Sequence, residues 1–268
     1  MPRAARQSGG MSGDQVRETA GARIRVIRAV LRVGEIHVRV DVDVRESPAT
    51  IPLVYTSLLE HFGPQDWWPG DTPFEVMVGA VLTQNTAWTN VEKAILRLRE
   101  RGLLEAAAMQ AASVETLADC IRPAGYYNVK ARRLHALCAF LAEQGVLGDP
   151  YRLRAAADIP TLRQQLLAVH GIGEETADSI LLYALDLPSF VVDAYTRRIF
   201  TRLGVFQGNE SYVAIQARFQ DQMPEDLACY NEYHALIVML GKSVCRPSPR
   251  CPICPLKDMC SHAHRISD

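Results

Sequence analysis

The sequence predicts an all-α protein whose helices form two domains. Apolar residues recur three or four positions apart from Ile51 onward, and Pro, Gly, Asn and Asp punctuate this pattern at short intervals. These are the features of amphipathic helices joined by short loops. With 268 residues, 48% of them hydrophobic and 22% charged, the chain can bury a core without disulfide bonds.

Residues 1–50 differ from the rest of the chain. The first 22 residues are rich in Gly, Ser, Ala and Arg without periodicity, and we expect them to be disordered. From Val33 to Val44 apolar and charged residues alternate, as in a half-buried strand with a turn at Gly34. This segment could form a short β ribbon on the body. We favour an accessory extension that contributes little to function.

The helical pattern from Ile51 onward is divided by recognisable start signals. Thr72 with Pro73, Asn128, and Pro160 with Thr161 each precede a periodic segment. The expected helices cover residues 53–62, 73–82, 89–100, 114–121, 129–145, 161–169, 174–185, 194–204 and 232–244.

Charge and hydropathy restrict the partners. The 29 Lys and Arg residues balance 30 Asp and Glu residues, so nucleic-acid binding would need a local basic patch or backbone dipoles. No apolar run approaches the roughly 20 residues of a membrane span. The N-terminus has no apolar core followed by a cleavage site. We therefore expect a cytoplasmic protein with no membrane partner.

Four of the seven cysteines are crowded near the C-terminus, in a pattern that predicts a metal site. They are Cys245, Cys251, Cys254 and Cys260. Thiolates bind zinc or an iron–sulfur cluster, and a single CxxC pair with two wider arms favours the cluster over zinc. Unligated thiols are the third alternative. The remaining cysteines, Cys120, Cys138 and Cys229, lie on apolar helical faces and are expected to pack as small hydrophobic residues.

A glycine-containing turn separates two amphipathic segments. The sequence predicts a helix ending at His170, a tight Gly171-Ile172-Gly173 turn and a helix beginning at Glu174. The two glycines permit positive φ and close approach of another backbone, and Ile172 anchors the turn in the core. Free N–H groups at the start of the second helix can bind a phosphate oxygen.

Asp193 follows the apolar residues Val191 and Val192 and opens the next helix. It could act simply as an N-cap, a role that Asp fills well. Alternatively, a carboxylate at this hydrophobic edge is weakly screened and could stabilise a developing cation.

The hairpin LLAVHGIGEETA, the VVDAY segment and the four-cysteine loop together resemble the endonuclease III family of helix-hairpin-helix DNA glycosylases, of the iron–sulfur type. The resemblance extends from Ile51 to Cys260. It implies a six-helix barrel domain over residues 68–187, a cluster domain over residues 51–67 plus 188–268, and an accessory extension over residues 1–50. It also implies base-excision repair of double-stranded DNA by a monomer that flips the damaged base into the cleft between the domains.

The resemblance further implies roles for individual residues. Asp193 would stabilise the oxocarbenium character of the sugar and activate the nucleophile, and Gly171, Ile172 and Gly173 would hold the DNA backbone. The four C-terminal cysteines would hold a [4Fe–4S] cluster, although the first arm has five intervening residues where the family usually has six.

One departure from the family pattern affects the reaction. Bifunctional members carry a lysine two residues after the second hairpin glycine, and this chain has Glu175 there. Without that amine no Schiff base forms, so we expect water to attack and the enzyme to be monofunctional. Lys93, Lys130 and Lys242 remain alternative sources of an amine.

Aromatic and amide residues suggest how a flipped base is held. Trp67, Trp68, Trp88 and Tyr126 could stack on the base, while Gln84 or Asn85 could fill the gap in the duplex. The pattern WWP, PFE, LTQNT and VVDAY with a hairpin Glu most resembles the 3-methyladenine DNA glycosylase branch.

Indole faces and the Glu175 carboxylate would attract a cationic alkylated purine. Glu175 could instead be an acid favoured in a first helical turn by the helix dipole. Two other functions stay open. One is an endonuclease III-like glycosylase with AP lyase activity on oxidised pyrimidines, and the other is a non-catalytic, cluster-bearing DNA-binding protein.

Overall fold

The computed structural model describes residues 26–33, 36–43, 48–65, 67 and 70–267. Within these ranges it contains twelve α-helices and one two-stranded sheet, with short 3-10 and π-helical segments between them. The all-α prediction is confirmed. No helix in the described part of the chain is both long and apolar enough to cross a bilayer.

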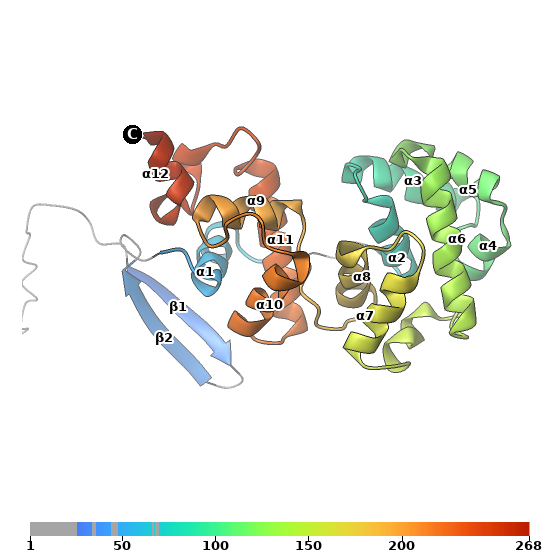
Figure 1. The fold of residues 1–268 in the computed structure, drawn as a ribbon, viewed down its shortest axis with the longest axis horizontal. Coiled ribbons are helices and arrows are strands. Elements are labelled where there is room, and N and C mark those ends of the chain that lie inside the picture. The colour runs from blue at the N-terminus through green and yellow to red at the C-terminus, as the bar shows by residue number, and fades with distance from the viewer. Residues whose placement is uncertain (1–25, 34–35, 44–47, 66, 68–69, 268) are drawn as a thin grey trace, which may run out of the picture.

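Figure 1 shows the helices gathered in two lobes. One lobe contains α2 (Pro73–Leu82), α3 (Trp88–Glu100), α4 (Ala106–Ala111), α5 (Val114–Cys120), α6 (Tyr127–Glu143), α7 (Ile159–Ala168) and α8 (Glu174–Ser179). The other contains α1 (Ile51–Phe62), α9 (Ala194–Leu203), α10 (Tyr212–Gln222), α11 (Leu227–Ser243) and α12 (Ser261–Ser267). The residue boundaries expected for the domains stay a prediction.

Residues from distant parts of the sequence form the core of the second lobe. The Tyr233 hydroxyl on α11 donates a hydrogen bond to the Ile51 carbonyl at 2.6 Å, which fastens α1 to the C-terminal helices. Phe190 stacks on Phe219 with ring centroids 4.1 Å apart, and Tyr233 meets Phe219 edge-on at 5.5 Å. Such aromatic contacts add to the stabilisation from burial alone.

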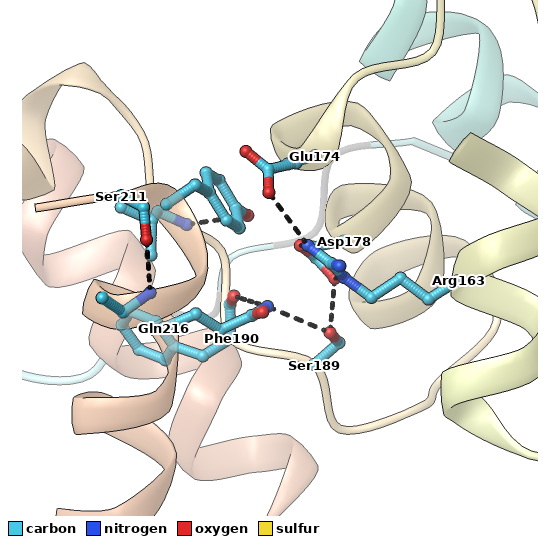
Figure 2. A network of polar contacts seen from close by, with 10 residues as sticks. Arg163, Glu174, Asp178, Ser189, Phe190, Ser211 and Gln216 are labelled. Carbon is cyan, nitrogen blue, oxygen red and sulfur yellow. Dashed lines mark hydrogen bonds and ion pairs between the residues drawn. The ribbon is translucent and has the colours of Figure 1, made fainter. Parts of the chain in front are cut away.

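The lobes meet along the π-helical segment Ile180–Ala184, which continues directly from α8 and contacts both α2 and α11. A polar network reinforces this junction (Figure 2). Asp178 on α8 is fully buried and accepts hydrogen bonds from Arg163 Nε at 2.9 Å and Nη2 at 3.0 Å, and from Ser189 Oγ at 2.6 Å. Gln216 Nε2 on α10 donates to the Phe190 carbonyl at 2.7 Å. The network fixes the segment that leads to Asp193 against α7 and α8.

Helix starts agree with the sequence in one case and differ in two. Thr72 caps α2 as predicted, with its Oγ1 accepting from Glu75 N at 3.1 Å. The prediction at Asn128 was wrong because α6 begins at Tyr127, two residues before the expected start, and its cap Tyr126 has a left-handed conformation. The prediction at Pro160 was also wrong. Asp158 is the cap of α7, since its carboxylate accepts from Thr161 N at 2.9 Å and Pro160 lies inside the first turn.

Three helices, α4, α10 and α12, were absent from the predicted set. The short, Ala-rich α4 has almost no contrast between its faces, which explains its absence. In α10, by contrast, Tyr212, Ile215 and Phe219 share a buried face behind the cap Ser211, so the pattern could have revealed it.

The N-terminal segment contains two strands, so the ribbon alternative is the one observed. β1 (Val26–Val33) pairs antiparallel with β2 (Ile36–Asp43), and Val33 lies opposite Ile36. The predicted turn at Gly34 and the predicted disorder of residues 1–22 fall outside the described residues. That this segment contributes little to function stays a prediction.

Candidate active site

A cavity of about 570 Å³ lies between the lobes. Its walls come from α2, α3, α8, the π-helical segment, the start of α9 and α11. Asp193 and Glu175 both line it, together with Trp67 and Trp88. Residues that the sequence singled out from four separate segments therefore surround one space large enough for a nucleobase.

The structure confirms the N-cap role of Asp193, and the catalytic role stays a prediction. Asp193 caps α9, because Oδ1 accepts hydrogen bonds from Thr196 N at 2.7 Å and Thr196 Oγ1 at 2.8 Å. It is also 8% exposed, at the wall of the cavity. Burial alone would raise the pKa of Asp193, but His234 and the Thr196 hydrogen bonds lower it below the usual value. The structure thus holds an ionised carboxylate at an apolar edge.

Two residues beside Asp193 were not anticipated. His234 on α11 lines the cavity with its Nε2 3.7 Å from Asp193 Oδ2. Its Nδ1 lies 2.5 Å from the hydroxyl of Tyr183, which belongs to the π-helical segment and also lines the cavity. An imidazole directly before the apolar run ALIVML was the available signal for His234. Tyr183 gave no sequence signal that separates it from a core residue.

Glu175 lies in the first turn of α8 and reaches the cavity. Glu175 is exposed. Partial desolvation by the protein around the cavity and the charge of Asp193 together raise the pKa of its carboxyl group. His234 and Arg197 oppose that shift. The two carboxylates therefore interact electrostatically across the same cavity.

The aromatic candidates separate into three groups. Trp67 and Trp88 line the cavity, and Trp68 lies outside the described residues. Tyr126 is 73% exposed and does not line the cavity. Lys242 lines the cavity as well, with its Nζ 5.4 Å from the centre of the Trp67 ring.

The two amide candidates have different environments. Gln84 Nε2 donates to the Gly171 carbonyl at 3.1 Å and to Thr176 Oγ1 at 2.9 Å, while Arg133 donates to its Oε1. Gln84 therefore ties the α2–α3 loop to the hairpin. Asn85 is exposed, in a left-handed conformation with φ of 53°.

The hairpin turn has the predicted position but uses its two glycines differently. Gly171 has φ of +82°, and a Cβ there would lie 2.3 Å from Arg133 Cγ. Gly173 has φ of −96°, so the expectation of positive φ is wrong for this residue. It is exposed and is the N-cap of α8, with no side-chain hydrogen bond to the start of the helix. Ile172 is buried, as its anchoring role requires.

The other lysines are placed away from the cavity. Lys93 is exposed on α3, and Lys130 is buried with its Nζ donating to the Leu82 and Ala124 carbonyls, both at 2.8 Å, and to Thr86 Oγ1 at 2.6 Å. These hydrogen bonds connect the end of α2 to the start of α6.

The C-terminal cysteines form one group around the segments that follow α11. Burial raises the pKa of Cys254 to about 11, and the other three thiols of the group add to that shift. Arg202 Nη1 on α9 donates to Cys245 Sγ at 3.4 Å, and its carbonyl accepts from Cys260 Sγ at 3.5 Å. Cys120 and Cys138 are buried and Cys229 is partly buried.

Comparison with known proteins places the chain in a family. Residues 78–225 match the model of the HhH-GPD superfamily of base excision DNA repair proteins. The chain belongs to this superfamily. A Methanocaldococcus jannaschii protein provisionally named a DNA repair glycosylase is 48% identical over 208 residues, which are 77% of this chain and 94% of that protein.

Two further similarities agree with this placement. Endonuclease III of Sulfolobus acidocaldarius is 30% identical over 192 residues, covering 70% of this chain and 82% of that enzyme. The crystal structure of the Helicobacter pylori 3-methyladenine DNA glycosylase bound to 1,N6-ethenoadenine has a TM-score of 0.64 and 30% identity, covering 72% of this chain and 98% of that one. The chain is therefore a base-excision DNA glycosylase of the HhH-GPD and endonuclease III superfamily.

Proposed function

We propose that this HhH-GPD glycosylase is monofunctional and hydrolyses the N-glycosidic bond of a cationic, alkylated purine flipped out of double-stranded DNA. The observation that carries the proposal is the pair of carboxylates, Asp193 and Glu175, in one cavity with two indole rings. Glu175 occupies the position at which bifunctional relatives are expected to carry the Schiff-base lysine.

Asp193 supplies the charge that the reaction requires. As the glycosidic bond breaks, positive charge develops on the sugar, and a buried carboxylate stabilises it more strongly than one in water. Thr196 occupies Oδ1, so Oδ2 is the oxygen available to the sugar and to an attacking water. No covalent intermediate with the protein is required, and the product is an abasic site.

Glu175 and the indoles supply selectivity. At about 4 Å and an effective dielectric constant near 20, a carboxylate attracts a unit positive charge by about 4 kcal/mol, and a neutral base gains none of this. The faces of Trp67 and Trp88 favour the same cation. An alkylated purine that is already cationic is also a good leaving group. The similarity to a 3-methyladenine DNA glycosylase supports this substrate class.

The DNA contacts follow from the hairpin and the α2–α3 loop. Gly171, Ile172 and Gly173 would place backbone N–H groups against a phosphate. Of the two amides, Asn85 suits insertion into the gap left by the flipped base, because Gln84 is engaged with the hairpin. Tyr126, exposed and outside the cavity, would contact the duplex and not the base. We expect the enzyme to act as a monomer.

The C-terminal cysteines fit a [4Fe–4S] cluster. In the described part of the chain, no three His, Cys, Asp or Glu side chains converge closely enough for a single metal ion. The charges of Cys245, Cys251 and Cys260 nevertheless contribute to the raised pKa of the Cys254 thiol. Four cysteines with a single CxxC pair and two wider arms suit a cluster better than zinc. When bound, the cluster would cross-link the loop after α11. Iron and acid-labile sulfide in equal amounts would support it, whereas zinc without sulfide would refute it.

The reaction type is tested with labelled duplexes that contain a methylated purine, thymine glycol, uracil or an abasic site. Each single-turnover reaction is divided between hot alkali and no alkali, with borohydride present in a parallel sample. The proposal predicts breaks at the methylated purine only after alkali, and no trapped complex. Breaks without alkali together with a trapped adduct would show that a lysine performs the chemistry.

A second candidate, a glycosylase with AP lyase activity, is favoured by one observation. Lys242 lines the same cavity as Asp193 and lies over Trp67, so it could supply the missing amine. If an adduct is trapped, Lys242→Gln should abolish it, while Lys93→Gln on the exposed face of α3 should leave it unchanged.

A further inference from the structure

Tyr183 and His234 form a chain of polar contacts with Asp193, and neither residue has a role in the reaction described above. These contacts run from Tyr183 on the π-helical segment through His234 on α11 to Asp193 at the start of α9. Both ring residues are buried, with Tyr183 6% and His234 8% exposed. Burying unpaired polar groups destabilises a protein. The burial of the Tyr183 and His234 side chains beside Asp193 therefore calls for an explanation.

The phenol determines which nitrogen of the imidazole carries a proton. When His234 is neutral, the Tyr183 hydroxyl donates to Nδ1 at 2.5 Å, which leaves the ring proton on Nε2. When His234 is protonated, Nδ1 donates to the phenol and Nε2 again carries hydrogen. Burial raises the pKa of Tyr183 far above its usual value, so the phenol retains its proton. In both states an N–H is directed toward Asp193.

That N–H lies near Asp193 Oδ2, the oxygen that the proposed reaction uses. His234 Nε2 lies 3.7 Å from Asp193 Oδ2 and has no hydrogen-bond partner in this state. Oδ1 is already occupied by the cap to Thr196. Polar contacts of this length in unliganded enzymes shorten once substrate closes the site.

We propose that the Tyr183–His234 pair positions the Asp193 carboxylate, with His234 Nε2–H holding Oδ2 toward the sugar of the flipped nucleotide. His234 acts through Asp193 and is a positioning residue. The inference rests on the proposed function, because it assumes that Asp193 acts on the glycosidic bond.

Other charged groups around the imidazole are compatible with this role. Glu175 on α8 interacts with His234 electrostatically, and Lys242 lies two turns further along α11 at the same cavity. The charge of Arg197 on α9 also acts on Glu175 and lowers its pKa. In either protonation state, Nε2 carries the hydrogen that faces Asp193 Oδ2.

The test measures single-turnover excision on the duplex that the wild-type enzyme processes, over a range of pH, for His234→Leu, His234→Gln and Tyr183→Phe. Loss of one hydrogen bond to a charged group corresponds to a roughly 10- to 100-fold loss. His234→Leu should lose this much and shift the acid limb of the pH–rate profile upward, because Asp193 then lacks its donor. His234→Gln should recover most of the rate, since its amide can donate to Oδ2. Tyr183→Phe should give an intermediate loss.

Controls separate a positioning role from a structural one. His61→Leu replaces an exposed histidine at the end of α1 and should leave the rate unchanged. Melting temperature and DNA affinity are measured for every variant. Equal losses in His234→Leu and His234→Gln with no shift of the acid limb would overturn the inference, as would an unchanged rate in both Tyr183→Phe and His234→Leu.

The failure of the proposed function would look different. If Asp193→Asn keeps the wild-type rate, or the wild type excises no base, the proposed function fails and the positioning role fails with it. If Asp193→Asn is inactive while His234→Leu is fully active, only the positioning role is wrong.

Discussion

The junction between the lobes depends on one buried carboxylate, so Asp178→Asn should destabilise the protein strongly. The substitution keeps the size of the side chain and removes its charge, which leaves Arg163 partly buried, with only Glu174 nearby at 4.0 Å. Asp178 accepts two hydrogen bonds from Arg163 and one from Ser189. Removing the charge of one partner in a buried ion pair lowers the free energy of unfolding by about 3–5 kcal/mol, and the partial exposure of Arg163 favours the lower end of this range.

A loss of about 3 kcal/mol lowers the melting temperature of a chain of this size by roughly 6–12 °C. Urea unfolding followed by circular dichroism measures the loss directly. Glu174→Gln is the matched control, because Glu174 is partly exposed and only 4.0 Å from the same guanidinium. It should change the free energy of unfolding by less than about 0.5 kcal/mol. A loss below about 1 kcal/mol for Asp178→Asn, or one equal to the control, would refute the reasoning.

Three further predictions concern the hairpin, the core and pH. Gly171→Ala should cost roughly 1–2 kcal/mol of unfolding free energy, because the new Cβ meets Arg133 at positive φ, while Gly173→Ala should be nearly neutral. Lys130→Met should cost about 3 kcal/mol in urea unfolding, since Met cannot make the three buried hydrogen bonds that Nζ donates. The raised pKa of Glu175 means that the folded state binds more protons than the unfolded state above the usual carboxyl pKa. Stability should therefore fall as pH rises through that window, and Glu175→Gln should remove this slope.

The sequence predicted those parts of the site whose signals are local. Thr72 and the hairpin glycines lie beside the elements that they define, and their side chains or backbones act within a few residues. Asp193 was noticed because a carboxylate follows an apolar run, and Glu175 because the family pattern has a lysine at its position. That these carboxylates face one cavity follows from the order of the helices, which the family resemblance implied.

The parts that sequence reasoning missed depend on long-range packing. Gln84 looked available for DNA, but its amide meets Gly171 and Thr176, 87 and 92 residues along the chain. His234 and Tyr183 form a pair across 51 residues, and no spacing rule connects them. Tyr126 resembled a stacking residue, but it is exposed at the start of α6 and does not line the cavity.

The most direct test of the catalytic assignment is the single-turnover rate of Asp193→Asn on a duplex that contains a methylated purine, with DNA affinity measured in parallel. Asparagine retains the N-cap of α9 and removes the charge, so the fold and the affinity should persist. If Asp193 stabilises the developing sugar cation, base excision should fall about 1,000-fold or more with nearly unchanged affinity. A rate within a few-fold of the wild type would contradict it, and an inactive wild type that still binds DNA would indicate a non-catalytic DNA-binding protein.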